Sequence, residues 1–129
     1  MRRAAIVIVT FKRQELLASL LDSVLSLSVA PWRVVVVDNE NSERTAAIVG
    51  DFERRAEALW GPTVDDPDAR GATSRTLYVP METNTGGSGG FSEGVRQAYE
   101  LGAEWFWVMD DDVAVEPDGL ETLARWSRE

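Results

Sequence analysis

The sequence predicts an α/β fold: a three-layer sandwich in which helices cover both faces of a mainly parallel sheet. Two observations favour this architecture. Short runs of β-branched residues alternate along the chain with longer segments whose apolar residues recur at helical spacing. The short runs are also apolar at successive positions, as expected of strands that are buried on both faces. The length of 129 residues suits a single domain, which can bury a core of its own.

The first half of the chain predicts two strands, each followed by a helix. Residues 4–11 (AAIVIVTF) and residues 33–38 (RVVVVD) are the continuous apolar runs of two buried strands. Between them, residues 13–27 place leucines and valines on one helical face. Residues 42–59 form the second helical pattern, with Ser42 as a candidate N-cap because its hydroxyl can accept a bond from a free backbone N–H.

The second half begins with a stretch of loop composition. Residues 60–76 contain two prolines, two glycines and three aspartates, and predict a surface loop inserted between the layered elements. Residues 77–81 (LYVPM) predict a short third strand. Pro80 has no backbone N–H to donate, so this strand is expected to end early or to lie at an edge of the sheet.

The remaining elements are a helix, a strand and a helix. Residues 91–102 predict a helix that follows a glycine-rich loop. Residues 104–110 (EWFWVMD) predict a fourth buried strand, whose tryptophans are expected to pack in the core or against a helix. Residues 116–126 predict the last helix. Its Pro117 suits the first helical position, where no backbone N–H is needed.

The composition limits the metal chemistry that the chain can perform. It contains neither cysteine nor histidine, so disulfides, thiolate metal sites and imidazole ligands are excluded. A metal bound here would be held by oxygen atoms. Oxygen ligands favour magnesium, manganese or calcium over zinc.

The charge pattern bears on partners and location. The formal net charge is −9, and Lys12 is the single lysine among 13 basic residues. An acidic chain without a basic stripe is not expected to bind nucleic acid. No stretch of the sequence approaches the roughly twenty apolar residues of a membrane span, and the apolar residues after Arg3 lack the cleavage site of a signal peptide. We therefore predict a cytoplasmic chain without a membrane span.

Polar residues follow each predicted strand at the point where it ends. These stretches are residues 10–13, 38–40, 82–90 and 110–112. Parallel strands place their carboxyl ends at one edge of the sheet, and open α/β sheets bind their ligands there. We call this edge the rim, and we predict that it carries the functional site.

The first candidate on the rim is the acidic cluster, formed by Asp110, Asp111 and Asp112. Side chains alternate along an extended chain, so Asp110 and Asp112 are expected to face the same way, with Asp111 turned from them. Two converging carboxylates suit a divalent cation. The alternative is a solvated acidic turn that caps the last helix, and no cation-rich segment lies nearby in the sequence to neutralise it. A calcium-binding EF-hand is excluded because Val115 occupies the position that requires glycine.

The second candidate is the glycine run at residues 84–91 (NTGGSGGF), which has four glycines within five positions. It fits neither the dinucleotide-binding fingerprint nor the Walker phosphate loop. One interpretation is a loop leading into a helix N-terminus, where free backbone N–H groups favour an anion or a closely packed ligand. The other is a turn that lets the helix pack tightly on the sheet.

The remaining rim residues also have two interpretations each. Asp38 could accept a hydrogen bond from a base or ribose, but an Asp–Asn pair such as Asp38–Asn39 is also common as a turn and N-cap. Lys12 and Arg13 could contact a diphosphate, or they could form the solvated start of a helix.

Two parts of the chain resemble a known family. IVIVTFKR with LLASLLDSVLS and VVVVDNE is similar to the opening of the family 2 glycosyltransferases, which have the GT-A fold. NTGGSGGFSEGVRQAYELGAEWFWVMDDDV resembles the branch that contains galactofuranosyltransferases and some rhamnosyltransferases. The resemblance covers nearly the whole chain except residues 60–76, and residues 84–112 are its distinctive part.

The resemblance implies roles for the rim residues. Asp38 would contact the nucleotide base, and Asp110 and Asp112 would hold manganese or magnesium against the diphosphate of a nucleotide-sugar. The donor pocket would be lined by Asn84, Gly86, Gly87 and Gly90. The other predicted contacts to the nucleotide-sugar are Thr10, Phe11, Arg13, Asn39 and Asp111.

The resemblance also implies a reaction. A sugar from a donor of the UDP-galactofuranose or dTDP-rhamnose type would pass, with inversion, to a hydroxyl of a glycan or glycolipid acceptor. Enzymes of this branch place the catalytic base well after the acidic motif, so the base is expected beyond Glu129 and the chain is expected to be the donor-binding part of a longer protein. That longer protein could associate peripherally with a membrane. The alternative is a non-catalytic nucleotide-binding or interaction module that retains the fold without the base.

Overall fold

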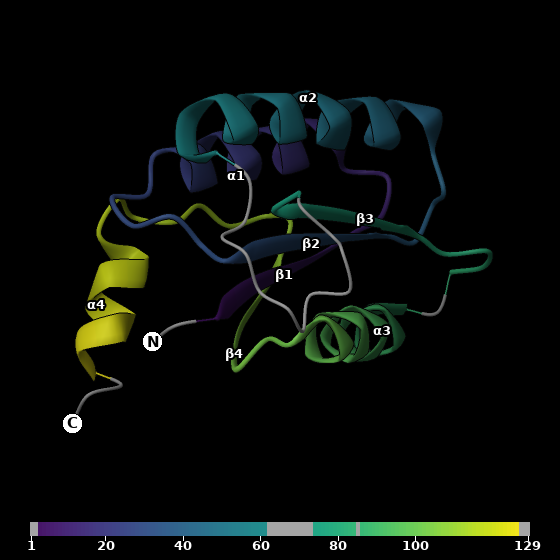
Figure 1. Ribbon diagram of the computed structural model, residues 1–129. Helices are drawn as coiled ribbons and strands as arrows, with labels where there is room; N and C mark the ends of the chain where they lie inside the picture. Colours follow the sequence, from purple (N-terminus) through teal and green to yellow (C-terminus); the bar gives the residue numbers. More distant parts are fainter. Residues whose placement is uncertain (1–2, 62–73, 85, 127–129) are drawn as a thin grey trace.

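The computed structural model describes residues 3–61, 74–84 and 86–126. Strands and helices alternate along the chain (Figure 1). In chain order the elements are β1 (Ala4–Thr10), α1 (Gln14–Leu25), β2 (Arg33–Asp38), α2 (Glu43–Trp60), β3 (Thr76–Pro80), α3 (Gly86–Leu101), β4 (Trp105–Asp110) and α4 (Gly119–Trp126).

The four strands form one parallel sheet with the order β3-β2-β1-β4. Thr10 is paired with Asp38, Asp38 with Pro80, and Val9 with Asp110, so the four carboxyl ends lie side by side. β3 is an edge strand and ends at Pro80, which confirms the prediction from that residue. The sheet therefore assembles the rim from strands that are far apart in the sequence.

Helices cover both faces of the sheet. α1 and α2 lie together on one face and α3 lies on the other (Figure 1). Successive side chains of the central strands point to opposite faces, and each set builds its own core. The set on the α1 and α2 face is Ile6, Ile8, Val34 and Val36. The set on the α3 face is Ala5, Val7, Val9, Val35 and Val37. The predicted three-layer α/β sandwich is confirmed.

The start of α2 follows the predicted cap, but the starts of α3 and α4 differ from the predictions. The Ser42 side chain accepts a hydrogen bond from the backbone N–H of Thr45 at 3.4 Å. α3 begins at Gly86, inside the glycine run, where we had predicted a loop up to residue 90. α4 begins at Gly119, so Pro117 precedes the helix. The Pro117 carbonyl instead accepts a hydrogen bond from Ser28 N–H at 2.7 Å, which fixes it outside the helix.

β4 is not the buried strand that its apolar sequence predicts. Its exposed fractions are 49% at Trp105, 37% at Phe106 and 48% at Val108. The reason lies in the sheet order, because β4 is the second edge strand and α3 packs over β1 and β2. Trp107 does pack against the core on the α1 and α2 face.

The surface loop predicted at residues 60–76 is shorter at both ends in the structure. α2 continues to Trp60 and β3 begins at Thr76. The ends are joined by Arg75, whose Nε donates to the Gly61 carbonyl at 3.0 Å. Residues 62–73 lie outside the described residues, so the prediction of an excursion there stays a prediction. In the described part of the chain, no helix has the length and apolar character to cross a membrane.

Candidate functional site

The rim is held together by hydrogen bonds between strand ends. Asn39 N–H donates to the Thr10 carbonyl at 3.0 Å, which ties the end of β2 to the end of β1. Met81 N–H donates to the Asp38 carbonyl at 2.9 Å and ties β3 to β2. The polar residues predicted to share one edge are therefore brought together.

The acidic cluster lies at the β4 end of the rim. The side chains of Asp110 and Asp112 are 53% and 52% exposed, whereas that of Asp111 is fully buried. This difference agrees with the predicted alternation. The three carboxylates nevertheless converge, because one ligand oxygen from each lies within 4.8 Å of the others. Asp111 is thus part of the candidate metal site together with the predicted pair.

Asp111 is held in place from a neighbouring strand. The Thr10 hydroxyl, at the end of β1, donates a hydrogen bond to Asp111 Oδ2 at 2.9 Å. Burial raises the pKa of the Asp111 carboxyl above its ordinary value, and the Thr10 hydrogen bond and the charge of Arg13 oppose this rise. The other oxygen, Oδ1, is buried and has no hydrogen-bond partner among the described residues.

These residues fit a divalent cation of the magnesium or manganese type. The three carboxylates supply the hard oxygen ligands that such cations prefer. A buried carboxylate oxygen without a hydrogen bond is costly, and coordination by a cation would remove that cost at Asp111 Oδ1. The observed geometry therefore supports the chemical interpretation of the cluster.

Arg13 is the counter-ion of the acidic cluster. Each of its three nitrogens lies near a different carboxylate: Nη2 is 3.9 Å from Asp110, Nε is 3.3 Å from Asp111, and Nη1 is 3.9 Å from Asp112. The sequence has no cation-rich segment near the aspartates. The fold nevertheless supplies a neutralising partner, because it brings a residue from the β1–α1 connection across to the end of β4.

Asp38 is fully buried and has partners within its own chain. Its Oδ1 accepts from Glu40 N–H at 2.9 Å, and its Oδ2 accepts from Ser42 N–H at 2.9 Å and from the Tyr78 hydroxyl at 2.6 Å. These contacts match the turn-and-cap interpretation, and the contact to a nucleotide base stays a prediction. Sequence reasoning missed Tyr78, because no local pattern links it to a residue 40 positions earlier.

The pKa of Tyr78 is raised well above its ordinary value. Burial is the largest cause, and the hydrogen bond to the Asp38 carboxylate and its negative charge act in the same direction. Tyr78 therefore keeps its proton and remains a hydrogen-bond donor to the rim.

The glycine run serves the tight-packing interpretation at Gly90, whereas binding of an anion or ligand at its start stays a prediction. A side chain at Gly90 would place its Cβ only 2.8 Å from Val9 Cγ1, so this glycine lets α3 pack closely on the sheet. Gly86, in contrast, is exposed, has a φ of 73° and has open space where a Cβ would be. Asn84 Oδ1 accepts from Gly86 N–H at 2.9 Å, and Asn39 Nδ2 donates to the Gly86 carbonyl at 3.0 Å. The start of α3 is thereby fixed at the rim; Gly87 lies in its first turn.

The connection after β1 presents two exposed side chains at the rim. Phe11 is exposed, and the Lys12 ammonium lies 5.1 Å from the centre of its ring. Lys12 has a φ of 58°, in the left-handed region, which turns the chain sharply before α1. This turn brings Arg13 toward the acidic cluster.

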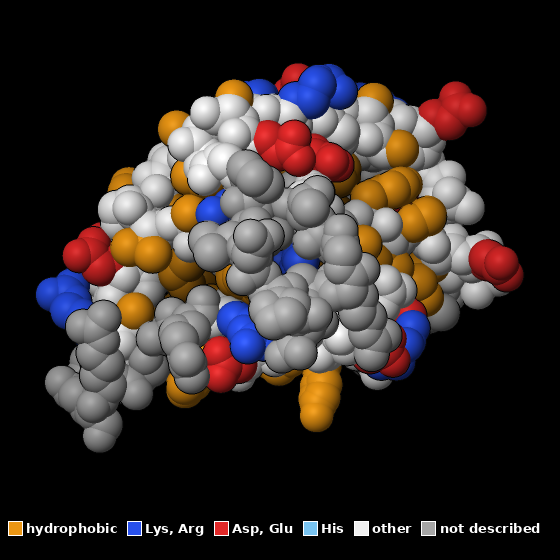
Figure 2. All heavy atoms as spheres, in the orientation of Figure 1, with side chains coloured by type: hydrophobic (Ala, Val, Ile, Leu, Met, Phe, Trp, Pro, Cys, Tyr) orange, Lys and Arg blue, Asp and Glu red, His pale blue; other side chains and the backbone are white. Residues whose placement is uncertain are grey.

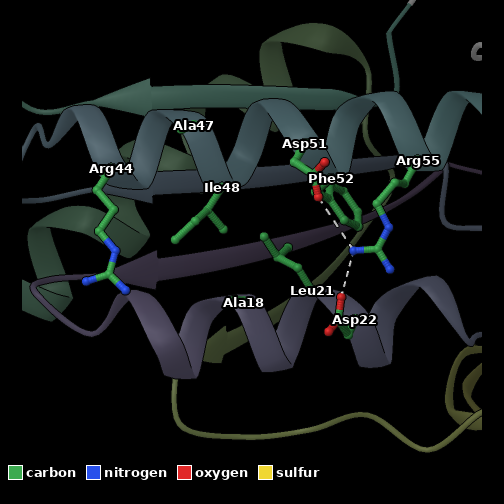
Figure 3. A pocket seen from close by; sticks show the side chains of 9 residues that line it. All are labelled: Ala18, Leu21, Asp22, Arg44, Ala47, Ile48, Asp51, Phe52 and Arg55. Carbon is green, nitrogen blue, oxygen red and sulfur yellow. Dashed lines mark hydrogen bonds and ion pairs between the residues drawn. The ribbon is translucent and has the colours of Figure 1, made fainter.

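A separate groove of about 270 Å³ lies between α1 and α2 (Figure 3). Leu21, Ile48 and Phe52 are among its apolar lining residues. At one end Arg55 pairs with Asp22 at 2.8 Å and with Asp51 at 3.7 Å, as the dashed lines show. The charges of Arg55, Asp22 and Asp51 are thus paired with one another. We therefore interpret the groove as a feature of the packing between α1 and α2 and not as a reactive centre.

Figure 2 shows one face of the molecule, on which acidic and basic side chains form small groups separated by apolar patches. On the described part of this face the basic groups do not merge into a continuous stripe. The prediction that the chain does not bind nucleic acid stays a prediction.

Comparison with known proteins supports a family assignment. Residues 5–129 match the model of Glycosyl transferase family 2. The galactofuranosyltransferase GlfT1 of Mycolicibacterium smegmatis is 35% identical over 106 residues, and GlfT1 of Mycobacterium tuberculosis is 32% identical over 106 residues. Each match covers 82% of this chain but only 28% and 29%, respectively, of the relative. The chain thus spans less than a third of the length of these curated relatives.

Solved structures share the fold. The mannosyltransferase PcManGT from Pyrobaculum calidifontis, in complex with GDP-Man and Mn²⁺, has a TM-score of 0.74 and 19% identity, over 98% of this chain and 32% of that protein. TarS from S. aureus has a TM-score of 0.71 and 19% identity, over 98% of this chain and 19% of TarS. These likenesses confirm the predicted GT-A type of α/β fold. Together with the family match, they show that the chain belongs to glycosyl transferase family 2.

Proposed function

We propose that this chain is the nucleotide-sugar-binding part of a glycosyltransferase, and that it binds the donor diphosphate at the acidic cluster through Mn²⁺ or Mg²⁺. The observation that carries the proposal is the convergence of Asp110, Asp111 and Asp112 at the carboxyl end of β4. Membership of glycosyl transferase family 2 supports it. The position agrees with the general rule that open α/β sheets bind ligands at this edge.

The rim residues would divide the work of binding. The exposed carboxylates of Asp110 and Asp112 would hold the cation, and Asp111 would add its buried oxygen while Thr10 keeps it in place. When bound, the cation neutralises negative charge that develops on the leaving nucleoside diphosphate. The N-terminus of α3 at Gly86 lies on the same rim, where its helix dipole favours the negatively charged part of the donor.

The donor is proposed to be of the UDP-galactofuranose or dTDP-rhamnose type, and the acceptor a hydroxyl of a glycan or glycolipid. Support comes from the two GlfT1 relatives, which are galactofuranosyltransferases, and from the distinctive residues 84–112. Transfer with inversion needs a base that deprotonates the acceptor opposite the leaving group. We assign no residue of this chain to that role.

A calorimetric titration of the chain with UDP, run with and without MnCl₂, tests the proposal. We expect UDP binding that depends on Mn²⁺. The double variant Asp110→Asn with Asp112→Asn removes the exposed ligands, so UDP affinity in Mn²⁺ should fall by about tenfold or more.

The matched control is Asp22→Asn with Asp51→Asn. It also removes two negative charges, but from the groove between α1 and α2. This control should bind UDP and Mn²⁺ like the wild type. UDP binding that is independent of Mn²⁺, or that persists in the variant of the acidic cluster, would contradict the proposal.

A further inference from the structure

We propose that Arg13 is an exchangeable internal cation: its guanidinium occupies the acidic cluster when no divalent cation is bound, and moves to the donor diphosphate when the cation binds. This inference rests on the proposed function and adds a positioning role for one residue. It predicts that Arg13 opposes binding of the cation alone and favours binding of the cation together with a diphosphate.

The geometry of the guanidinium is that of a loosely held counter-ion. Its three nitrogens lie 3.3–3.9 Å from the three carboxylates, one nitrogen to each. These are ion-pair distances, and all three are longer than a charge-assisted hydrogen bond. Asp111 Oδ1, at 3.3 Å from Nε, still has no hydrogen-bond partner among the described residues. Arg13 therefore neutralises the cluster without satisfying its buried oxygen.

Arg13 is also free to leave. Its side chain is 47% exposed, so water can replace the contacts it loses. It occupies the N-cap position of α1 but makes no side-chain capping bond there. The helix is anchored instead through the backbone, where Leu17 N–H donates to the Arg13 carbonyl at 2.9 Å. Movement of the guanidinium would leave this backbone bond in place.

Charge determines where the guanidinium can lie. Without a diphosphate, the guanidinium and a divalent cation compete for the acidic cluster. With a diphosphate, both can be bound at the rim. A guanidinium and a divalent cation at the same three carboxylates would repel each other at close range. A diphosphate on the cation brings new negative oxygens to the rim, and arginine binds phosphate oxygens in a bidentate fashion. Arg13 would then exchange carboxylates for phosphate while the cation keeps the aspartates.

The test compares the wild-type chain with Arg13→Gln and Arg13→Lys in two calorimetric titrations. In the first, MnCl₂ is added without nucleotide; in the second, UDP is added in saturating MnCl₂. Arg13→Gln should bind Mn²⁺ alone about threefold to tenfold more tightly than the wild type, as loss of partly exposed ion pairs implies. It should bind UDP more weakly by a similar factor. Arg13→Lys keeps the positive charge but loses the bidentate geometry of the guanidinium. Both of its affinities should lie between those of the wild type and Arg13→Gln.

The matched control is Arg54→Gln, which removes an exposed arginine of α2 whose ion-pair partner, Asp51, lies away from the rim. It should change neither titration. The opposite signs of the two effects separate this role from a merely structural one, which would weaken both. Equal Mn²⁺ affinity of Arg13→Gln and wild type, with UDP binding that still depends on Asp110, would overturn the inference and leave the proposed function intact. Absence of Mn²⁺-dependent UDP binding in the wild type would overturn the proposed function and this inference with it.

Discussion

At the end of β1, the Thr10 side chain links two strands by a single hydroxyl group. It donates to the buried Asp111 carboxylate, whose second oxygen has no hydrogen bond among the described residues. A buried carboxylate with few hydrogen bonds depends strongly on each one it has. The contribution of Thr10 to stability should therefore come from its hydroxyl and not from its methyl group.

Thr10→Val keeps the shape of the side chain but removes this donor. We expect a loss of about 1–3 kcal/mol in the free energy of unfolding, because the Asp111 carboxylate stays buried. Urea denaturation measures it. Thr10→Ser retains the hydroxyl and is the control, which should lose less. Equal stability of Thr10→Val and the wild type would show that Asp111 does not depend on this bond.

The Tyr78 hydroxyl should give the protein a dependence on alkaline pH. The pKa of Tyr78 in the folded state is raised above the ordinary value of 10.0 by burial and by the bond to Asp38. The folded state thus holds this proton more tightly than the unfolded state. The stability it contributes is fully present below about pH 10 and is lost as pH rises through the folded pKa.

Tyr78→Phe tests this dependence. We expect it to lower the free energy of unfolding by about 1.5–3 kcal/mol at neutral pH, as for a hydrogen bond to a charged group. The difference from the wild type should shrink above pH 10. The difference between the ultraviolet pH titrations of the wild type and of Tyr78→Phe reports the ionisation of the Tyr78 hydroxyl alone. Ionisation at or below pH 10 in that difference would contradict the assignment.

At the scale of elements, the approach of α3 to the sheet depends on glycines within the helix. A Cβ at Gly94 would lie 2.6 Å from Val7 Cγ1 and 2.9 Å from Val37 Cγ2. Both valines are fully buried strand residues with little room to move. The glycine run therefore continues as a packing surface beyond the rim, and the helix tolerates the cost of glycine because only a bare backbone fits.

Gly94→Ala should destabilise the protein by about 1–3 kcal/mol through overpacking. Gly50→Ala is the matched control in the middle of α2, where the added Cβ would lie 3.8 Å from Arg54 Nη1. That substitution should stabilise the protein by about 0.5–1 kcal/mol through helix propensity. Thermal or urea unfolding of both variants gives the sign of each change. A stabilising Gly94→Ala would show that α3 does not pack as closely as described.

At the scale of the whole molecule, the edge strand β4 exposes apolar side chains on both faces of the sheet. Trp105, Phe106 and Val108 are each more than a third exposed. An apolar edge strand with free backbone groups can pair with other chains. We expect the isolated chain to self-associate through this strand at high concentration.

Val108→Lys places a charge in the exposed part of β4 and should reduce both self-association and binding of a hydrophobic dye. Sedimentation over a range of concentrations and dye fluorescence measure the two effects. Leu59→Lys adds the same charge at an exposed apolar position of α2 and is the control. An equal change in both variants would attribute the effect to net charge and not to β4.

The sequence alone predicted the order of strands and helices along the chain and which residues lie on the rim. Continuous β-branched runs such as residues 33–38, and helical spacing such as that of residues 42–59, are local patterns. In parallel strands the carboxyl ends share one edge, so Asp38, Asn39 and Asp110 could be assigned to that edge without knowledge of the strand order. The alternation at Asp110–Asp112 also followed from strand geometry.

Only the tertiary structure decided the partners of these residues. Arg13 and the acidic cluster are nearly a hundred residues apart, and Tyr78 and Asp38 are 40 apart, so no local pattern links them. The exposure of β4 likewise depends on which strands and helices lie beside it and not on its own apolar sequence. Local periodicity fixes which way a side chain points, whereas its burial and its charge partner depend on chain segments that only the folded sheet brings together.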